Sequence, residues 1–240
     1  MPRLIIANWK MNLSCADAVD LAEKLSAINQ AEFQLVIAPS ALHIGKISGV
    51  VASSKIKLAA QDLSSFESGA YTGENSAACF AELGCKYSII GHSERRIYLN
   101  ESADIIQKKV TNSLNAGLTP IVCVGESLMQ NNSVNLEKYL AEQLIYSLPA
   151  NLDDEIIIAY EPVWAIGSGV SASIDHIENV LNLLKDICIN ILGLEKKAKL
   201  LYGGSVNLEN CKNILSINVV DGLLVGSASN NFENFIQMLR

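Results

Sequence analysis

Polar and charged side chains follow short apolar runs at three distant places in the chain. The three motifs are Asn8-Trp9-Lys10, Gly91-His92-Ser93-Glu94-Arg95-Arg96 and Tyr160-Glu161-Pro162. Their amide, ammonium, imidazole and carboxylate groups are of the kinds that bind anions and transfer protons. Taken singly, each is more often a structural group, because ion pairs that only stabilise a fold use the same residues. They indicate a site only if the fold brings them to one place.

Glycine-rich connections follow the last three apolar runs. They are Gly167-Ser168-Gly169, Gly203-Gly204-Ser205 and Gly226-Ser227. Because glycine has no Cβ, backbone N–H groups in such loops can approach a ligand closely. In barrels of alternating strands and helices, the last two loops often bind phosphate. Glycine also serves ordinary tight turns, so these loops favour a phosphate site only together with the polar motifs.

One glycine pattern admits a different interpretation. Residues 167–172 match the dinucleotide-binding pattern G-x-G-x-x-A. In that pattern the first glycine belongs to the tight turn directly after a strand. Here residues 162–166 stand between the strand and the glycines, and no acidic residue ends a following strand at the spacing that a ribose needs. We therefore expect no nicotinamide cofactor.

Eight apolar runs rich in β-branched residues recur along the chain and are typical of strands buried on both faces. They cover residues 4–7, 35–38, 57–60, 87–90, 119–124, 156–160, 199–201 and 222–225. One strand with the helical stretch after it takes about 30 residues, the usual size of such a unit. The sequence therefore predicts a single α/β domain over residues 1–240, a parallel eight-stranded (β/α)8 barrel. An open doubly wound sheet stays an alternative, because periodicity does not establish closure. Either fold binds ligands at the carboxyl ends of its strands.

Two helices have clear boundary signals. An apolar stripe from Ile177 to Ile191 is predicted to begin at Asp175, with Glu178 as its capping partner. A second stripe, from Ala103 to Leu114, is predicted to end in a glycine cap; its last residues are Asn115-Ala116-Gly117.

The 240-residue chain carries a formal net charge of −7. Nucleic acids and anionic membranes bind a surplus of Lys and Arg, so this charge argues against both as partners. The six cysteines are scattered without a C-x-x-C pair and apart from the three histidines, so no metal or redox site is expected. No apolar run approaches the roughly 18 residues of a membrane span, and the N-terminus lacks a signal-peptide core. We expect a cytoplasmic protein with reduced cysteines.

In their order and spacing, the strand-end motifs together resemble the triosephosphate isomerase family. Three further stretches carry the resemblance: Gly69-Ala70-Tyr71-Thr72-Gly73-Glu74, Val163-Trp164-Ala165-Ile166-Gly167 and Tyr202-Gly203-Gly204-Ser205-Val206. The likeness extends over residues 8–229. It implies a barrel that interconverts dihydroxyacetone phosphate and D-glyceraldehyde 3-phosphate, in glycolysis and gluconeogenesis, by proton transfer through an enediolate without a cofactor.

The resemblance also implies a role for each motif. Glu161 would be the base, and His92 would polarise the carbonyl as a neutral imidazole, a pairing for which this family is an established example. Lys10 would hold a positive charge near the enediolate and the phosphate, and Asn8 would orient substrate oxygens. The backbone N–H groups that would bind the phosphate belong to Gly167, Ser205, Gly226 and Ser227.

Residues 162–169 resemble the lid of this family, which closes over the substrate and excludes water. Tyr202 and Ser205 match the positions that latch the lid. Glu126 would accept a hydrogen bond from the Trp164 indole.

Two residues depart from the usual family pattern. Ser168 replaces a threonine in the lid, and Ser227 replaces the second glycine of the last phosphate loop. Serine keeps the backbone contact there only if its φ is negative or if left-handed strain is tolerated.

Residues 72–74 lie in the loop that, in this family, inserts into a second subunit beside Asn8 and Lys10. The resemblance thus implies a homodimer, although such a sequence is also ordinary turn chemistry. His43 and His176 lie in helical stretches and are expected to be structural. Glu94 and Arg95 are expected to form supporting ion pairs.

Two rival functions remain open at this point. A barrel with the same loops could bind a sugar phosphate without turning it over. It could also isomerise a larger sugar phosphate, which a comparison of triose and pentose phosphates would decide.

Overall fold

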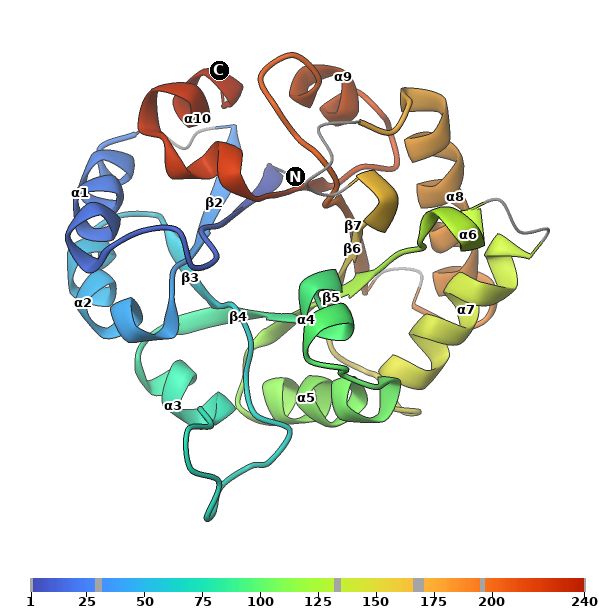
Figure 1. The fold of residues 1–240 in the computed structure, drawn as a ribbon, viewed down its shortest axis with the longest axis horizontal. Helices are drawn as coiled ribbons and strands as arrows, with labels where there is room; N and C mark the ends of the chain where they lie inside the picture. The colour runs from blue at the N-terminus through green and yellow to red at the C-terminus, as the bar shows by residue number, and fades with distance from the viewer. Residues whose placement is uncertain (1, 29–31, 132–134, 166–170, 195–196, 240) are drawn as a thin grey trace.

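A computed structural model describes residues 2–28, 32–131, 135–165, 171–194 and 197–239. Its eight described strands form one closed parallel barrel in chain order, surrounded by helices (Figure 1). The strands are β1 (Arg3–Asn8), β2 (Phe33–Ala38), β3 (Lys57–Ala60), β4 (Cys85–Ile90), β5 (Thr119–Val124), β6 (Ile156–Tyr160), β7 (Ala198–Tyr202) and β8 (Gly222–Val225). The predicted barrel is confirmed, because β1 pairs with both β2 and β8. This pairing overturns the open-sheet alternative.

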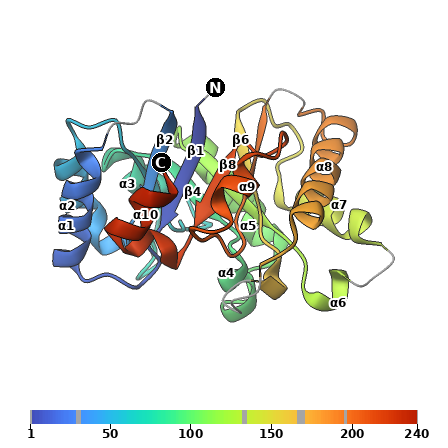
Figure 2. The same ribbon diagram turned by 90° about the horizontal axis from the view of Figure 1, so that it is seen from above.

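The helices surround the barrel or cap its carboxyl end. They are α1 (Cys15–Ser26), α2 (Ala41–Val51), α3 (Ala77–Glu82), α4 (Ser93–Tyr98), α5 (Ala103–Asn115), α6 (Leu128–Asn131), α7 (Leu136–Ser147), α8 (Ile174–Asn190), α9 (Cys211–Leu215) and α10 (Phe232–Met238), with 3₁₀ turns η1 (Val163–Ala165) and η2 (Ser227–Asn230). Figure 2 shows α4 and α6 at the end of the barrel opposite the N-terminus, where the strands finish. None of the helices among the described residues combines the length and the apolar character needed to cross a lipid bilayer.

Two apolar layers explain why the strands read as continuous apolar runs. Alternate strand residues fill the barrel interior, such as Leu4 and Ile6 of β1. The residues between them, such as Ile5 and Ala7, pack outward against the helices. Because both faces of each strand are buried, the sequence shows no polar alternation along them.

One helix boundary differs from its prediction and one agrees. Helix α8 begins at Ile174, and the Ser173 side chain caps it by accepting a hydrogen bond from the His176 N–H. The predicted start of the helix at Asp175 was wrong, because Ser173, two residues earlier, is the capping residue and accepts from the His176 N–H. The predicted glycine cap of α5 is confirmed by Gly117, whose φ is 72°.

Candidate active site

The first element of the site is the end of β1, where the main chain around Lys10 is held from both sides. The Lys10 N–H donates to Asn8 Oδ1 at 3.1 Å, and the Lys10 carbonyl accepts from Gln61 Nε2 at 2.8 Å. Lys10 has a φ of 50°, in the left-handed region that costs energy for any residue but glycine. Its ammonium lies 2.5 Å from a Glu94 carboxylate oxygen. The strained backbone thus places a paired cation at the carboxyl end of the barrel.

His92 stands between β4 and α4 and is fixed in one protonation pattern. Its Nδ1 accepts a hydrogen bond from the Glu94 N–H at 3.2 Å. A ring nitrogen that accepts cannot carry its own proton, so the imidazole is neutral and its hydrogen is on Nε2. Nε2 lies 3.1 Å from Glu161 Oε1. The buried ring therefore presents one N–H donor to the site.

Glu161 directly follows β6 and its carboxylate is almost fully buried, with 1% of the residue exposed. Oε2 accepts a hydrogen bond from the Ser93 N–H at 2.9 Å, whereas Oε1 lies 3.1 Å from His92 Nε2 and makes no hydrogen bond within the part of the chain that the structure describes. The neighbouring strand approaches so closely that a Cβ on Gly125 would lie 1.7 Å from the Glu161 carbonyl oxygen. The site therefore holds a buried carboxylate that has one oxygen without a hydrogen bond among the described residues.

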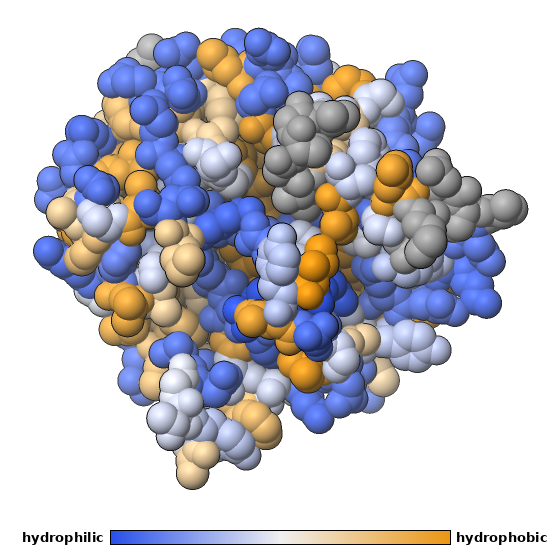
Figure 3. All heavy atoms as spheres, viewed as in Figure 1, coloured by the Kyte–Doolittle hydropathy of each residue, from blue (hydrophilic) through white to orange (hydrophobic). Residues whose placement is uncertain are grey.

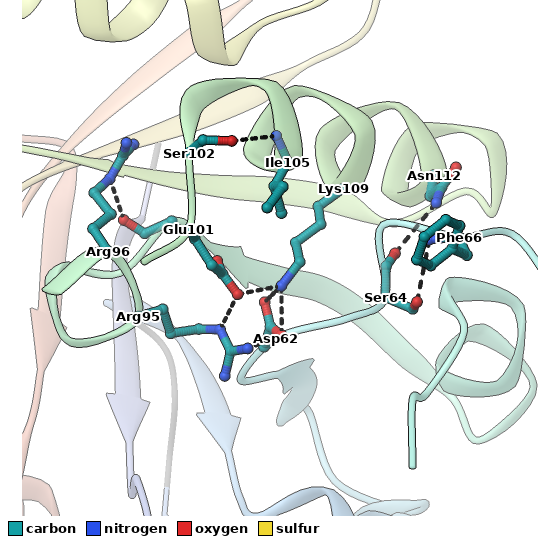
Figure 4. A network of polar contacts seen from close by, with 11 residues as sticks. Asp62, Ser64, Phe66, Arg95, Arg96, Glu101, Ser102, Ile105, Lys109 and Asn112 are labelled. Atoms are coloured by element: carbon teal, nitrogen blue, oxygen red, sulfur yellow. Dashed lines mark hydrogen bonds and ion pairs between the residues drawn. The ribbon is translucent and has the colours of Figure 1, made fainter. Parts of the chain in front are cut away.

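A buried ion network holds α4, which supplies both the Ser93 N–H and Glu94 (Figure 4). Arg95 contacts Asp62 at 2.9 Å and Glu101 at 2.7 Å, and Lys109 contacts the same two carboxylates at 2.7 and 2.6 Å. Burial raises the pKa of Asp62 to about 6, although Lys109 and Arg95 lower it. The supporting ion pairs expected of Glu94 and Arg95 are thus present.

The described glycine loops meet Lys10 and His92 around one cavity of about 640 Å³. Its lining comprises Asn8, Lys10, Asn12, His92, Glu94, Gly203, Gly204, Ser205, Val206, Asn207, Leu224, Gly226, Ser227 and Ala228. Glu161 is not one of the lining residues. It borders the cavity through Gly203, which does line it, because a Cβ on Gly203 would lie 3.2 Å from Glu161 Cγ. Figure 3 shows hydrophilic and hydrophobic side chains mixed at the centre of this face.

Glu126 organises the chain on both sides of Glu161. Its buried Oε1 accepts hydrogen bonds from Trp164 Nε1 at 2.8 Å and from the Tyr160 hydroxyl at 3.0 Å. Its backbone carbonyl accepts from the Val163 N–H at 3.0 Å. Burial raises the pKa of Tyr160, and the nearby Glu126 charge raises it further. The predicted contact between Trp164 and Glu126 is therefore confirmed.

Comparison with known proteins agrees with this geometry. A family model described as triosephosphate isomerase matches residues 3–240. The chain belongs to the triosephosphate isomerase family. The triosephosphate isomerase of Thermoanaerobacter pseudethanolicus is 40% identical over 95% of each chain. Those of Francisella tularensis subsp. novicida and Francisella philomiragia are 38% and 37% identical, and each alignment covers 100% of this chain and 96% of the relative.

Within this triosephosphate isomerase fold, most of the predicted site residues come together. Those that line the cavity are Asn8, Lys10, His92, Ser205, Gly226 and Ser227, with Glu161 at its border. Gly167 and Ser168 lie outside the described residues, as does most of the glycine pattern at 167–172. Ser227 begins η2, and it is not among the described residues other than glycine that have positive φ. The replacement of glycine by serine therefore causes no left-handed strain.

Tyr202 and Ser205, the two residues predicted to latch the lid, both contact the chain that follows Glu161. The Ser205 hydroxyl donates to the Ala165 carbonyl at 2.6 Å. Burial raises the pKa of the Tyr202 hydroxyl, whereas its contact with the Ala172 backbone lowers it. Ser205 thus joins the loop after β7 to the segment that follows Glu161.

Sequence reasoning missed two residues that support the candidate site. Gln61 and Asp62 directly follow β3, and one holds the Lys10 backbone while the other anchors α4 through Arg95. The signal that could have found them was the one applied to the other strands, namely polar residues at a strand end.

Proposed function

We propose that this chain interconverts dihydroxyacetone phosphate and D-glyceraldehyde 3-phosphate by proton transfer between neighbouring carbons. The observation that carries the proposal is the convergence of three groups on one cavity. Lys10 and a neutral His92 line the cavity, and the Glu161 carboxylate lies at its border, 3.1 Å from His92 Nε2. Membership of the triosephosphate isomerase family supports the same reaction.

Glu161 is the base in this proposal. Its carboxylate takes the proton from the carbon beside the carbonyl, and the C–H electrons form the double bond of the enediolate. The same carboxylate returns the proton to the adjacent carbon. Because Glu161 borders the cavity and is held by the Ser93 N–H, it must move toward the substrate before it acts. Its free oxygen is the one next to His92.

His92 and Lys10 stabilise the charge that develops on the substrate oxygens. The His92 Nε2–H donates to the carbonyl oxygen, which becomes the enediolate oxygen. A neutral donor suits this step because the ring does not lose a proton to the carboxylate beside it. The Lys10 ammonium is placed by a rigid backbone, so little rearrangement accompanies the reaction.

Local groups bind the phosphate, since the net charge of −7 gives no general attraction for an anion. Ser205, Gly226 and Ser227 line the cavity together with Lys10, and their backbone N–H groups are the proposed phosphate donors. A Cβ on Gly226 would lie 3.5 Å from Lys10 Cε, so this loop and the cation face the same ligand. Gly167 belongs to the same proposal by resemblance.

A coupled assay tests the proposed function directly. D-glyceraldehyde 3-phosphate formation from dihydroxyacetone phosphate is first observed by NMR without added metal or nucleotide, and turnover is expected; the coupled assay, in which a second enzyme oxidises the aldehyde with NAD, then gives the rate. A pentose phosphate in the same assay tests the rival isomerase. Binding of the triose phosphate without turnover, or turnover of the pentose phosphate alone, contradicts the proposal.

We propose further that two copies associate through the segment between β3 and α3, which projects from the barrel (Figure 1). Its Phe66 and Tyr71 rings stack 3.7 Å apart and are 45% and 42% exposed. Met11, beside Lys10, is 95% exposed. Equilibrium sedimentation that finds a monomer at micromolar concentration contradicts this proposal.

We also propose a single domain over residues 1–240, located in the cytoplasm. All six cysteines are free, which supports a reducing compartment. The closed barrel uses strands from both ends of the chain, which supports one cooperative unit. Two separate unfolding transitions in calorimetry would contradict the single domain.

A further inference from the structure

His176, at the start of α8, extends the hydrogen-bond chain around Glu126. Its Nε2 lies 2.9 Å from the Tyr160 hydroxyl and 3.6 Å from Glu126 Oε1. Its ring also meets the Trp164 ring edge-on, with centroids 5.5 Å apart and planes at 74°. One imidazole therefore contacts all three members of the Tyr160, Glu126 and Trp164 cluster.

The direction of each hydrogen bond follows from the chemistry of the groups. An ionised carboxylate only accepts, so the Tyr160 hydroxyl gives its one proton to Glu126. The Tyr160 oxygen is then left as an acceptor, and His176 Nε2 must carry the hydrogen that it receives. This bond is kept whether or not Nδ1 is protonated.

Two members of the cluster, Tyr160 and Trp164, flank the catalytic Glu161 in the sequence. Tyr160 immediately precedes Glu161, Trp164 follows it by three residues, and both side chains bind the same Glu126 oxygen. The other Glu126 oxygen is buried without a partner among the described residues. A buried carboxylate that lacks donors is costly, so a neighbouring cation or strong donor stabilises it. His176 Nε2 approaches the other oxygen of this carboxylate, Oε1, at 3.6 Å and is the group among the described residues that can supply that charge.

We propose that His176 is a positioning residue for Glu161, acting through Tyr160 and Glu126. This inference rests on the proposed isomerase function. The imidazole holds the Tyr160 hydroxyl on Glu126 and, when protonated, adds a positive charge beside that carboxylate. The backbone on either side of Glu161 is thereby kept in one place.

Within the described part of the chain, the other titratable groups near the His176 ring come from three neighbouring strands and from α8 itself. Glu126 follows β5 and Tyr160 belongs to β6, while Tyr202 of β7 lies behind the Tyr160 ring at 6.2 Å. On the same helix, Asp175 and Glu178 are exposed. A histidine is the group among these that ordinarily titrates near neutral pH.

Three variants test the proposal. His176→Gln places an amide N–H near the position of Nε2 without a titratable group, whereas the amide of His176→Asn is too short to reach Tyr160. We expect His176→Gln to keep its kcat, and His176→Asn to lower kcat about fivefold with little change in KM, the effect of one lost hydrogen bond. His43→Gln, on α2, is the matched control and should leave kcat unchanged.

An NMR measurement that does not depend on enzyme activity tests the role of His176 separately from the proposed isomerase function. The indole N–H signal of Trp164 in NMR is identified by its loss in Trp164→Phe and followed from pH 5 to 8. It should titrate in the wild type and in His43→Gln but not in His176→Gln. Equal kcat in all variants, or an indole titration unchanged by His176→Gln, overturns the proposal. If the wild type shows no isomerase activity, the proposed function fails while the indole titration still tests the contact.

Discussion

Replacement of Glu161 by Asp tests the base most sharply, because it keeps the carboxylate and changes only its reach. The side chain loses one methylene group, which withdraws the carboxylate by about 1.5 Å, and the 2.9 Å contact with the Ser93 N–H is lost. Since a misplacement of about 1 Å can cost about 10²-fold in rate, we expect kcat to fall by about 10² to 10³-fold. The substitution buries no new group, so the barrel should fold normally.

The assay measures initial rates in both directions, together with competitive inhibition by glycerol 3-phosphate, which has the phosphate but no carbonyl. Lys10 and the phosphate loops are untouched by the substitution, so the inhibition constant should stay within about twofold of the wild type. A loss confined to kcat identifies Glu161 as a group that acts on the reacting carbons.

Glu178→Asp is the matched control, because Glu178 is an exposed glutamate on α8. Its kcat should equal that of the wild type. The reasoning fails if Glu161→Asp keeps kcat within about threefold, because a retracted base could not then be the proton acceptor. It also fails if glycerol 3-phosphate binding is lost in parallel, which would make Glu161 a structural residue.

Three further substitutions give distinct outcomes. Lys10→Met should lower kcat/KM by about 10²-fold, the value of a charge-assisted contact, and an unchanged steady-state rate would contradict its role. Asp62→Asn removes a carboxylate whose pKa rises on folding from 3.8 to about 6. The folded wild type binds more protons in that window, so its stability relative to Asp62→Asn should fall by up to about 3 kcal/mol as the pH rises from 4 to 7. Urea titrations at the two pH values measure this, and parallel pH curves would contradict it. Gly204→Ala places a Cβ 2.3 Å from the Tyr202 hydroxyl oxygen and 2.9 Å from Pro162 Cγ. It should cost about 1 to 3 kcal/mol of stability, and an unchanged thermal midpoint would contradict the packing argument.

The strands could be predicted from sequence because both of their faces are buried. The runs at 119–124 and 156–160 coincide with β5 and β6, since apolar side chains there face the barrel interior and the helices in turn. The start of α8 could not be placed as well, because Ser173 and Asp175 are both good capping residues. Only the observed Ser173 contact distinguishes them.

Much of the site geometry depends on contacts between distant residues, which periodicity does not contain. The residue types at positions 10, 92 and 161 follow from the strand-end rule. The Ser93 N–H that holds Glu161 lies 68 positions away in the chain, so the residues around Glu161 do not predict the position of its carboxylate. His176 reads as an ordinary helical residue, and its contacts with Tyr160 and Glu126 emerge only when β6 and α8 pack together.

The strand that leads to Lys10, β1, is the first of the described strands, and the strand that leads to Gly226, β8, is the last. The two pair side by side from Leu4 with Gly222 to Ala7 with Val225. Because a ribosome releases β1 long before β8, the cation and the anion-binding loop meet only after β8 has been synthesised. A nascent chain cut short before β8 has neither a closed ring nor a place for phosphate. Isomerase turnover therefore requires that β1 and β8 pair. The time at which activity appears during refolding measures when this pairing forms.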